Sequence, residues 1–200
     1  MAQETEAKFY VRRPEEMLKR MEALNAKKVD ARVRELNLRF DTPEGELHKA
    51  GHVLRLRQDR RVRLTYKGSE RTPPGTLGRR EVEVTVSDFA TTQELLEALG
   101  YEVVFIYEKY RSTYELGELE VVLDELPYGH FIEIEGKEDQ IQPTAERLGL
   151  KWEEVIRDSY HQLFERVRTN QHWSIRDLTF DGLKSVRVTA ADLGVKPADE

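Results

Sequence analysis

Residues 131–136 of this chain read FIEIEG, and residues 4–11 read ETEAKFYV. Both stretches repeat a carboxylate at every second position, at Glu4, Glu6, Glu133 and Glu135. Successive side chains of a β-strand point to opposite faces of the sheet, so the glutamates within each stretch share one face. These two stretches therefore predict strands with one largely apolar face and one acidic face.

Six further stretches alternate in the same way. They are RELNLRFD (34–41), VLRLR (53–57), VRLTYKG (62–68), RREVEVTV (79–86), FIYEKYRSTY (105–114) and ELEVVLD (118–124). Turn signals such as TPEG at 42–45 and PYG at 127–129 separate some of them. Helical periodicity is clearest in PEEMLKRMEALNAKK at 14–28, which begins at a proline. The sequence thus predicts an α+β fold with about eight strands.

The polar faces of these strands carry clustered charge of both signs. A sheet with one solvated face would explain simple alternation, and surface ion pairs would explain single pairs of opposite charge. Like charges two residues apart repel, however, and they recur here as Glu-x-Glu, Arg-x-Arg and Lys-x-Arg. Eight antiparallel strands can close around one small ligand. We therefore expect an eight-stranded antiparallel closed β-barrel with a charged lumen and with helices packed on the outside.

A lumen of this kind suits a polyanion together with a divalent cation. Basic side chains that could bind phosphoryl oxygens are Arg55, Arg57, Lys67, Arg79, Lys109 and Arg111. Arg80 is the alternative to Arg79, since either arginine could enter that strand. Carboxylates that could bind Mg²⁺ or Mn²⁺ are Glu4, Glu6, Asp124, Glu133 and Glu135. A metal ion would then bridge the acidic residues and the phosphate groups.

The composition limits the classes of function. The chain has 200 residues, of which 35% are charged against a usual quarter, yet 32 basic residues nearly balance 38 acidic ones. Such balance argues against nucleic acid as the main partner. The absence of cysteine excludes thiolate metal sites and thiol nucleophiles. The start MAQETEAK lacks the apolar stretch of a signal peptide, and no run approaches membrane-spanning length, so we expect a cytoplasmic protein with no membrane partner.

Eight motifs, taken in order, resemble one known family. They are ExExK at 4–8, FDTPEG at 40–45, LRLR at 54–57, LTYKG at 64–68, RREVE at 79–83, EKYRSTY at 108–114, VVLDELPYGHFIEIEG at 121–136 and SYHQLF at 159–164. This order resembles the CYTH superfamily, also called the triphosphate tunnel metalloenzymes. We therefore expect a CYTH-like tunnel domain at 1–168 and a C-terminal extension of unknown role at 169–200.

The resemblance implies an eight-stranded antiparallel tunnel that uses Mg²⁺ or Mn²⁺ and binds a triphosphate-containing small molecule. It implies that Lys8 binds this substrate and helps to orient or activate water, which makes Lys8 the candidate catalytic residue. It implies that the basic residues named above contact phosphate groups and that the carboxylates named above contact the metal ion. It also implies a supporting role for Glu81 and Glu83. The chain departs from the family at Arg39, where an aromatic residue is common.

Within the family, the stretch from residue 100 to 164 looks most like the bacterial branch related to class IV adenylyl cyclases. A cyclase must hold adenine and ribose so that the 3′-hydroxyl attacks the α-phosphorus, and no stretch here indicates an adenine pocket. We therefore expect a metal-dependent triphosphatase that releases phosphate from tripolyphosphate, a nucleoside triphosphate or thiamine triphosphate. The alternatives are an adenylyl cyclase that forms cyclic AMP and pyrophosphate, and a non-catalytic module that binds polyphosphate or nucleotide.

Residues 169–200 resemble no part of the family that we recognise. SVRVT at 185–189 is compatible with an edge strand, and DLTFDGL at 177–183 with a helix or a docked turn. The last several residues are expected to be disordered. The extension would plug one end of the tunnel or contribute to a homodimer contact.

Overall fold

The structure is a computed structural model that describes residues 5–70 and 79–200. Its strands in chain order are β1 (Thr5–Val11), β2 (Lys27–Asp41), β3 (Val53–Gln58), β4 (Val62–Glu70), β5 (Arg79–Val86), β6 (Glu102–Leu116), β7 (Leu119–Leu126) and β8 (Gly129–Gly136). Its helices are α1 (Pro14–Ala23), α2 (Glu46–Lys49), α3 (Phe89–Ala98), α4 (Glu138–Arg147), the 3₁₀ helix η1 (Trp152–Glu154), α5 (Tyr160–Asn170) and α6 (Ala190–Leu193). None of the helices in these two ranges is long and apolar enough to cross a membrane. The predicted α+β class is confirmed.

The eight strands form one sheet in the order β1-β8-β7-β6-β2-β3-β4-β5. The pairs β1/β8, β8/β7, β7/β6, β2/β3, β3/β4 and β4/β5 are antiparallel, as expected. Within the described ranges no hydrogen-bonded pairing joins β1 to β5, so the closed barrel is not supported. Other segments occupy the outer edge of β1 instead: the Ile156 N–H donates to the Lys8 carbonyl at 2.8 Å, and the Ala198 N–H donates to the Tyr10 carbonyl at 2.9 Å. These bonds use backbone groups that a further strand would need.

The chain divides into two compact units. The first contains residues 1–33, 109–175 and 180–200, and the second contains residues 34–108 and 176–179. Strands β2 and β6, with 15 residues each, run through both units. The predicted C-terminal extension contributes to both units rather than forming a unit of its own.

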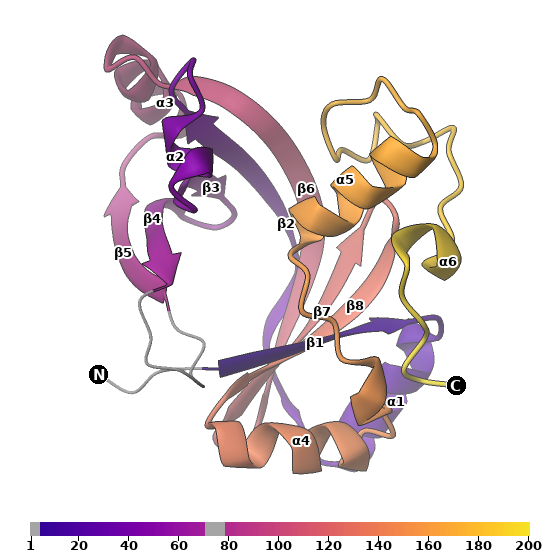
Figure 1. Cartoon of the computed structure of the whole chain (residues 1–200). Coiled ribbons are helices and arrows are strands. Elements are labelled where there is room, and N and C mark those ends of the chain that lie inside the picture. Colours follow the sequence, from indigo (N-terminus) through magenta and orange to yellow (C-terminus); the bar gives the residue numbers. More distant parts are fainter. Residues whose placement is uncertain (1–4, 71–78) are drawn as a thin grey trace. The chain divides into compact units, whose positions relative to one another are not determined.

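In the first unit, α1 and α4 cover the apolar face of β1, β7 and β8 (Figure 1). Helix α1 begins at Pro14, as predicted, and buries Met17 and Met21, which lie one helical turn apart. These methionines share a core with alternate residues of the strands, among them Phe9 and Ile132, all at 0% exposure. The alternation of apolar and polar residues in the sequence therefore predicts which face of the strands packs against α1 and α4.

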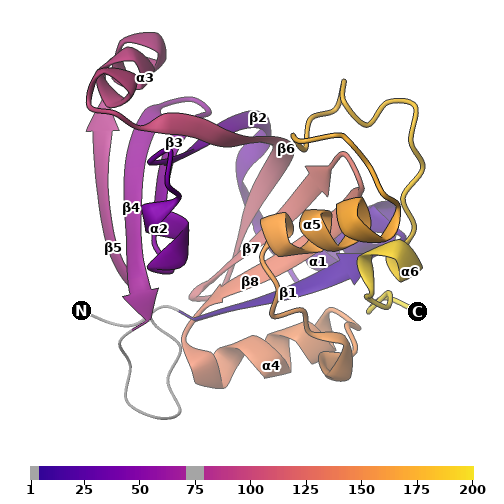
Figure 2. The same cartoon turned by 45° about the horizontal axis from the view of Figure 1, so that its top comes forward.

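Helix α5 covers the opposite face of the same sheet, as seen in two views (Figures 1 and 2). It starts with a capping box, in which Ser159 accepts from the Gln162 N–H and the Gln162 side chain accepts from the Ser159 N–H. The box fixes the first turn, and so it places Tyr160 against Phe131 of β8 with ring centroids 5.1 Å apart. This face is the one that carries the charged residues of the strands.

The C-terminal residues are ordered against β1 and α1, which corrects the expected disorder. Asp199 is 3% exposed, and its carboxylate accepts from the backbone N–H groups of Arg12 at 3.0 Å and Arg13 at 2.8 Å. Arg13 is the N-cap residue of α1 and provides no side-chain cap itself. Asp199 therefore satisfies the N–H of the N-cap residue from the far end of the chain. The edge strand at 185–189 is also wrong, because those residues form no strand.

The second unit has its own small core. Leu38, Phe40 and Leu56 of β2 and β3 pack with Leu96 of α3. Since strand residues alternate, the other face of β2, β3 and β4 carries the polar residues between them, including Arg55 and Arg57.

Candidate functional site

A cluster of five charged side chains lies on the α5 side of the first unit's sheet. The register pairs Lys8 of β1 with Glu133 of β8, and Arg111 of β6 with Asp124 of β7; Lys109 precedes Arg111 by two residues. Strand parity therefore places all five on one face of the sheet. We call these residues the buried charge cluster.

Asp124 is the centre of the cluster and is 0% exposed. Its Oδ2 accepts from Lys109 Nζ at 2.9 Å and from Arg111 Nη2 at 2.6 Å, and its Oδ1 accepts from Arg111 Nε at 2.7 Å. The Tyr160 hydroxyl donates a further bond at 2.9 Å. Burial by itself would raise the pKa of Asp124, but the charges and hydrogen bonds of Arg111 and Lys109 outweigh it and hold that pKa well below its ordinary value. Both oxygens of this predicted metal ligand thus already have protein partners.

Glu133 is 8% exposed and shares Arg111 with Asp124. Its Oε2 accepts from Arg111 Nη2 at 2.6 Å, and its Oε1 lies 3.4 Å from Lys8 Nζ. Burial and the nearby Asp124 raise the pKa of Glu133, whereas Arg111, Lys8 and Lys109 lower it, and the net shift is downward. Within this unit acidic and basic residues alternate on neighbouring strands of one face.

Tyr160 is a member of this site that residue-by-residue reasoning from the sequence did not identify. Besides its bond to Asp124, its ring lies under two cations, with Lys8 Nζ 4.3 Å and Lys109 Nζ 5.5 Å from the ring centroid. Burial and the charges of Asp124 and Glu133 raise the pKa of Tyr160 well above its ordinary value, so the hydroxyl stays protonated and donates. The serine and glutamine of the capping box could have located the start of this helix, but not the contact across the sheet.

A row of carboxylates crosses the same face next to the cluster. Glu6 of β1 lies opposite Glu135 of β8, which lies opposite Glu120 of β7. Like charges directly opposite on neighbouring strands destabilise a sheet unless a counter-charge is present. Glu120 was not among the predicted ligands, although the alternation in ELEVVLD already placed it on the same strand face as Asp124. Glu4, a predicted ligand, lies outside the described residues.

This row fits Mg²⁺ or Mn²⁺ in the chemistry of its donors. In the described ranges, no three Asp, Glu, His or Cys side chains converge closely enough to form a protein-only metal cage. Mg²⁺ does not need such a cage, because it retains water ligands and is bound through one or two carboxylates plus the phosphates of a substrate. Glu6 and Glu135, opposite each other in register, meet that requirement.

The second unit brings together the remaining basic candidates. Arg55 of β3 donates to the Tyr107 hydroxyl at 3.5 Å and to Thr65 Oγ1 at 3.4 Å, and Thr65 donates to Glu83 at 2.7 Å. Lys67 Nζ donates to Glu81, its register partner, at 2.6 Å. The two supporting carboxylates therefore lie beside basic or hydrogen-bonding partners. The strand residue Arg79 lies opposite Glu70 next to a register shift, and its side chain is outside the described part.

Arg57 lies in a crowded group of guanidiniums in that unit. Burial lowers the pKa of Arg57, and the neighbouring Arg55 and Arg63 lower it further, while Glu35 at 3.6 Å offsets part of this. Asp59 Oδ2 lies 3.6 Å from Arg57 Nε. Repulsion among buried cations favours binding of an additional anion at this face.

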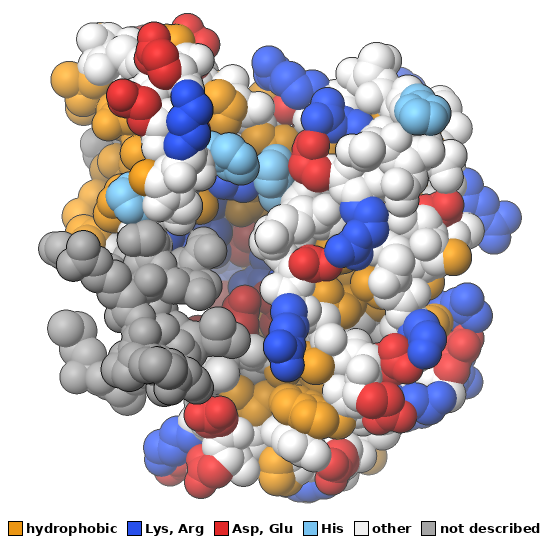
Figure 3. Space-filling view, in the orientation of Figure 1, with side chains coloured by type: hydrophobic (Ala, Val, Ile, Leu, Met, Phe, Trp, Pro, Cys, Tyr) orange, Lys and Arg blue, Asp and Glu red, His pale blue; other side chains and the backbone are white. Residues whose placement is uncertain are grey.

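Charged residues around α4 are solvated. Around α4, side chains of both signs are interspersed on the outer surface (Figure 3). Lys137 and Glu118 there form an ion pair, with side chains 67% and 65% exposed. Such pairs contribute little to stability. Solvated surface ion pairs therefore explain the charges around α4 but not those of the buried charge cluster.

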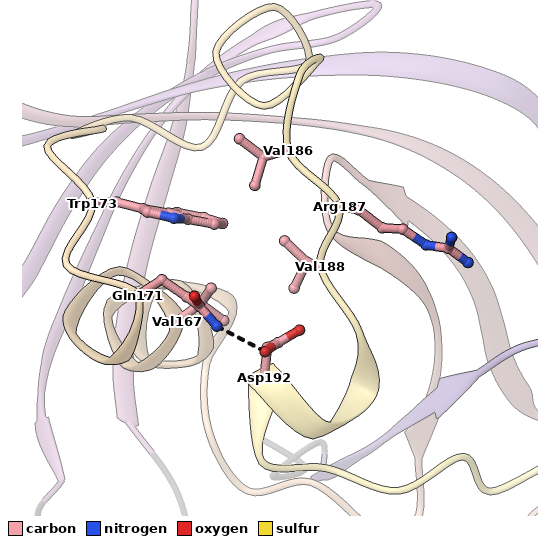
Figure 4. A pocket seen from close by; sticks show the side chains of 7 residues that line it. All are labelled: Val167, Gln171, Trp173, Val186, Arg187, Val188 and Asp192. Atoms are coloured by element: carbon pink, nitrogen blue, oxygen red, sulfur yellow. Dashed lines mark hydrogen bonds between the residues drawn. The ribbon is translucent and has the colours of Figure 1, made fainter.

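A separate hollow lies in the C-terminal part of the first unit. Val167, Trp173, Val186 and Val188 line it, together with Arg187 and the hydrogen-bonded pair Gln171 and Asp192 (Figure 4). Its volume is about 250 Å³. None of the predicted site residues lines this hollow.

The fold is shared with several solved structures. A candidate adenylate cyclase from Vibrio parahaemolyticus is 23% identical with a TM-score of 0.73, over 82% of this chain and 98% of that one. The protein PH1012 from Pyrococcus horikoshii is 27% identical with a TM-score of 0.66, over 78% and 96%. A candidate adenylyl cyclase from Hippeastrum, described as having a dominant triphosphatase activity, is 19% identical with a TM-score of 0.63, over 82% and 95%.

No curated protein matches the chain. The family model of the CYTH domain matches residues 2–163, which include every strand and all residues of the buried charge cluster. The sequence motifs, the eight-stranded antiparallel sheet and this match agree, and the chain belongs to the CYTH domain family.

Proposed function

We propose that this protein is a divalent-metal-dependent triphosphatase that hydrolyses a triphosphate-containing substrate and releases phosphate. The observation that carries the proposal is the concentration of cations on the polar strand faces of a CYTH chain. Lys8, Lys109 and Arg111 lie in the first unit, and Arg55 and Arg57 in the second. Guanidinium and ammonium groups in partly dehydrated surroundings bind phosphoryl oxygens strongly.

In this proposal Lys8 is the catalytic residue. It is 6% exposed, and its ammonium is held between Glu133, the Tyr160 ring and the Asp158 carbonyl at 3.3 Å. An ammonium constrained in this way presents its positive charge to a substrate oxygen or the attacking water with little loss of entropy on binding. Lys109 and Arg111, held by Asp124, contribute fixed positive charge for the phosphate oxygens.

The acidic residues hold the metal in this proposal. Glu6 and Glu135 are the pair whose register fits a hard cation, with Glu4, Asp124 and Glu133 assigned through the family resemblance. When bound, Mg²⁺ or Mn²⁺ neutralises phosphate charge and polarises a phosphoryl oxygen. The structure gives Asp124 and Glu133 a second task, because each carboxylate fixes the cations beside it.

Hydrolysis is favoured over cyclisation because it needs only the triphosphate and a positioned water, whereas cyclisation also needs a fixed nucleoside. The Hippeastrum protein, described by its dominant triphosphatase activity, supports this order. The name of the Vibrio protein supports the alternative, an adenylyl cyclase.

Product analysis tests the proposal. The purified protein is incubated with tripolyphosphate, ATP or thiamine triphosphate, each with Mg²⁺ or Mn²⁺, and the products are separated by ion exchange. We expect orthophosphate; cyclic AMP with pyrophosphate would establish the cyclase, and binding without turnover would establish a binding module. Glu133→Gln should abolish turnover and weaken Mn²⁺ binding, whereas Glu118→Gln, a surface control, should leave both unchanged. Full metal-dependent activity in Glu133→Gln would remove Glu133 from the site.

A further inference from the structure

Asn37 of β2 is a fully buried amide whose hydrogen bonds are unsatisfied. Its exposure is 0%, and within the described part of the chain neither Oδ1 nor Nδ2 has a partner. Buried polar atoms in native proteins almost always have partners, so an amide with both atoms unpaired requires an explanation. An unsatisfied buried amide lowers the stability of the fold, and an apolar residue of similar size would avoid this loss.

The position of Asn37 places it among the phosphate-binding candidates of the second unit. It lies opposite Arg57 on β3, which lies opposite Arg63 on β4, so these three side chains form one row on the polar face. The adjacent row contains Arg39 and Arg55. The Nε atoms of Arg55, Arg57 and Arg63 are likewise buried without a hydrogen-bond partner among the described residues.

The two sides of this row differ in net charge. On one side lie Arg39 and Arg55, with Glu83 bonded to Thr65 and with Lys67 paired to Glu81. On the other side Glu35 and Asp59 contact Arg57, and Asp59 also accepts from Arg63. Phosphoryl oxygens therefore fit on the Arg55 side. A group that carries hydrogen-bond donors fits on the carboxylate side, and Asn37 lies at the boundary.

The Asn37 amide has both a hydrogen-bond donor and an acceptor, and a phosphate group can use only the donor. The oxygens of a triphosphate only accept hydrogen bonds, while Asn37 presents one acceptor and one donor group side by side. The complementary partner is a ring that carries an amino group next to an unprotonated ring nitrogen. Asparagine recognises adenine through such an edge, with two parallel hydrogen bonds.

We propose that Asn37 is a specificity-determining residue that recognises the amino-substituted heterocycle of a triphosphate ester. The substrate is then an organic triphosphate, such as a nucleoside or aminopyrimidine triphosphate, and not inorganic tripolyphosphate. This inference rests on the proposed function, since it assigns the organic end of the same substrate. Because Asn37 is fully buried, binding requires neighbouring side chains, such as that of its register partner Arg57, to move.

The test is equilibrium binding of three probes, ATP, thiamine triphosphate and tripolyphosphate, by titration calorimetry in EDTA, where no metal-dependent turnover occurs. Asn37→Leu should leave the melting temperature unchanged or higher, because it removes an unsatisfied amide. It should weaken binding of ATP or thiamine triphosphate by roughly tenfold to a hundredfold, the range for loss of a bidentate contact, and change tripolyphosphate binding by less than about twofold. The organic probe that is affected identifies the heterocycle.

Two further variants complete the design. Thr65→Val alters a buried polar residue of the same face whose hydroxyl is hydrogen-bonded, and it should affect all three probes alike. If Asn37→Leu does not fold, Asn37→Ala takes its place with the same expectation. Equal weakening of all three probes, or no change in any, overturns the role of Asn37 but leaves the triphosphatase proposal intact. If the wild-type protein binds none of the probes, with or without Mg²⁺, the proposed function fails and the inference fails with it.

Discussion

Asp124→Asn tests whether the buried charge cluster stabilises the fold independently of any metal. The substitution preserves the shape of the side chain but removes a charge that is 0% exposed and contacts Lys109 and Arg111. Removing one partner of a buried ion pair leaves an uncompensated charge and costs about 3–5 kcal/mol. The remaining amide oxygen still accepts one hydrogen bond, which favours the lower end, about 3 kcal/mol. For a chain of this length that corresponds to a fall in melting temperature of about 6–12 °C.

Differential scanning calorimetry at pH 7 in EDTA is the assay, with Glu125→Gln as the matched control. Glu125 is the next residue on the same strand, and it pairs with Arg32, whose side chain is 51% exposed. A solvated pair of this kind contributes about 0–1 kcal/mol, so the control should melt close to the wild type. The two variants thus separate burial of the charge from loss of a carboxylate on β7.

The pH dependence supplies a second readout of Asp124→Asn. Because the pKa of Asp124 is lowered in the folded state, its stabilising contribution is present above the unfolded pKa of about 4 and is lost as pH falls below that value. The difference in stability between wild type and variant should therefore be constant from pH 7 to about pH 5 and shrink in more acidic solution. If Asp124→Asn melts with the wild type in EDTA and differs only when Mg²⁺ or Mn²⁺ is added, Asp124 acts as a metal ligand and this reasoning is refuted.

Three other outcomes are expected. Tyr160→Phe keeps the ring but removes the hydroxyl that donates to Asp124, so it should cost about 1.5–3 kcal/mol of stability in thermal unfolding. Since the pKa of Tyr160 is raised, the wild type should lose stability as pH rises above about 10, and the variant should lose less; identical alkaline profiles would contradict the bond. Asp199→Ala should cost about 1.5–3 kcal/mol by removing a charged acceptor from the Arg12 and Arg13 N–H groups, and an unchanged melting temperature would show that the C-terminal contact is dispensable. Arg57→Ala should weaken tripolyphosphate binding by about 1.5–3 kcal/mol in calorimetry, and unchanged affinity would place Arg57 outside the phosphate site.

The sequence was sufficient for properties that depend on local period. Alternation at every second residue identified which side chains share a face, and Lys109, Arg111 and Glu133 are on the face predicted for them. The proline and the methionine spacing located α1. These properties follow from the backbone geometry of a single strand or helix, so neighbouring residues are enough to reveal them.

The partners of those side chains could not be predicted in the same way. Asp124 was expected to face a metal, but cross-strand register and the start of α5 give it three protein donors, Lys109, Arg111 and Tyr160. The unpaired amide of Asn37 likewise depends on which residues of β3 and β4 lie beside it. Register is set by packing of the whole sheet, and no local pattern specifies it.

By itself, the sequence determined the α+β class, the family and the charged faces of the strands. Only the tertiary structure showed that no described pairing joins β1 to β5, and that backbone N–H groups of Ile156 and Ala198, 148 and 188 positions from their partners Lys8 and Tyr10, donate hydrogen bonds at the β1 edge. It likewise decided that Asp199 accepts from the N–H of Arg13, the N-cap residue of α1, 186 positions away. Hydrogen bonds between such distant segments form only after the chain is folded, and so the local sequence carries little trace of them.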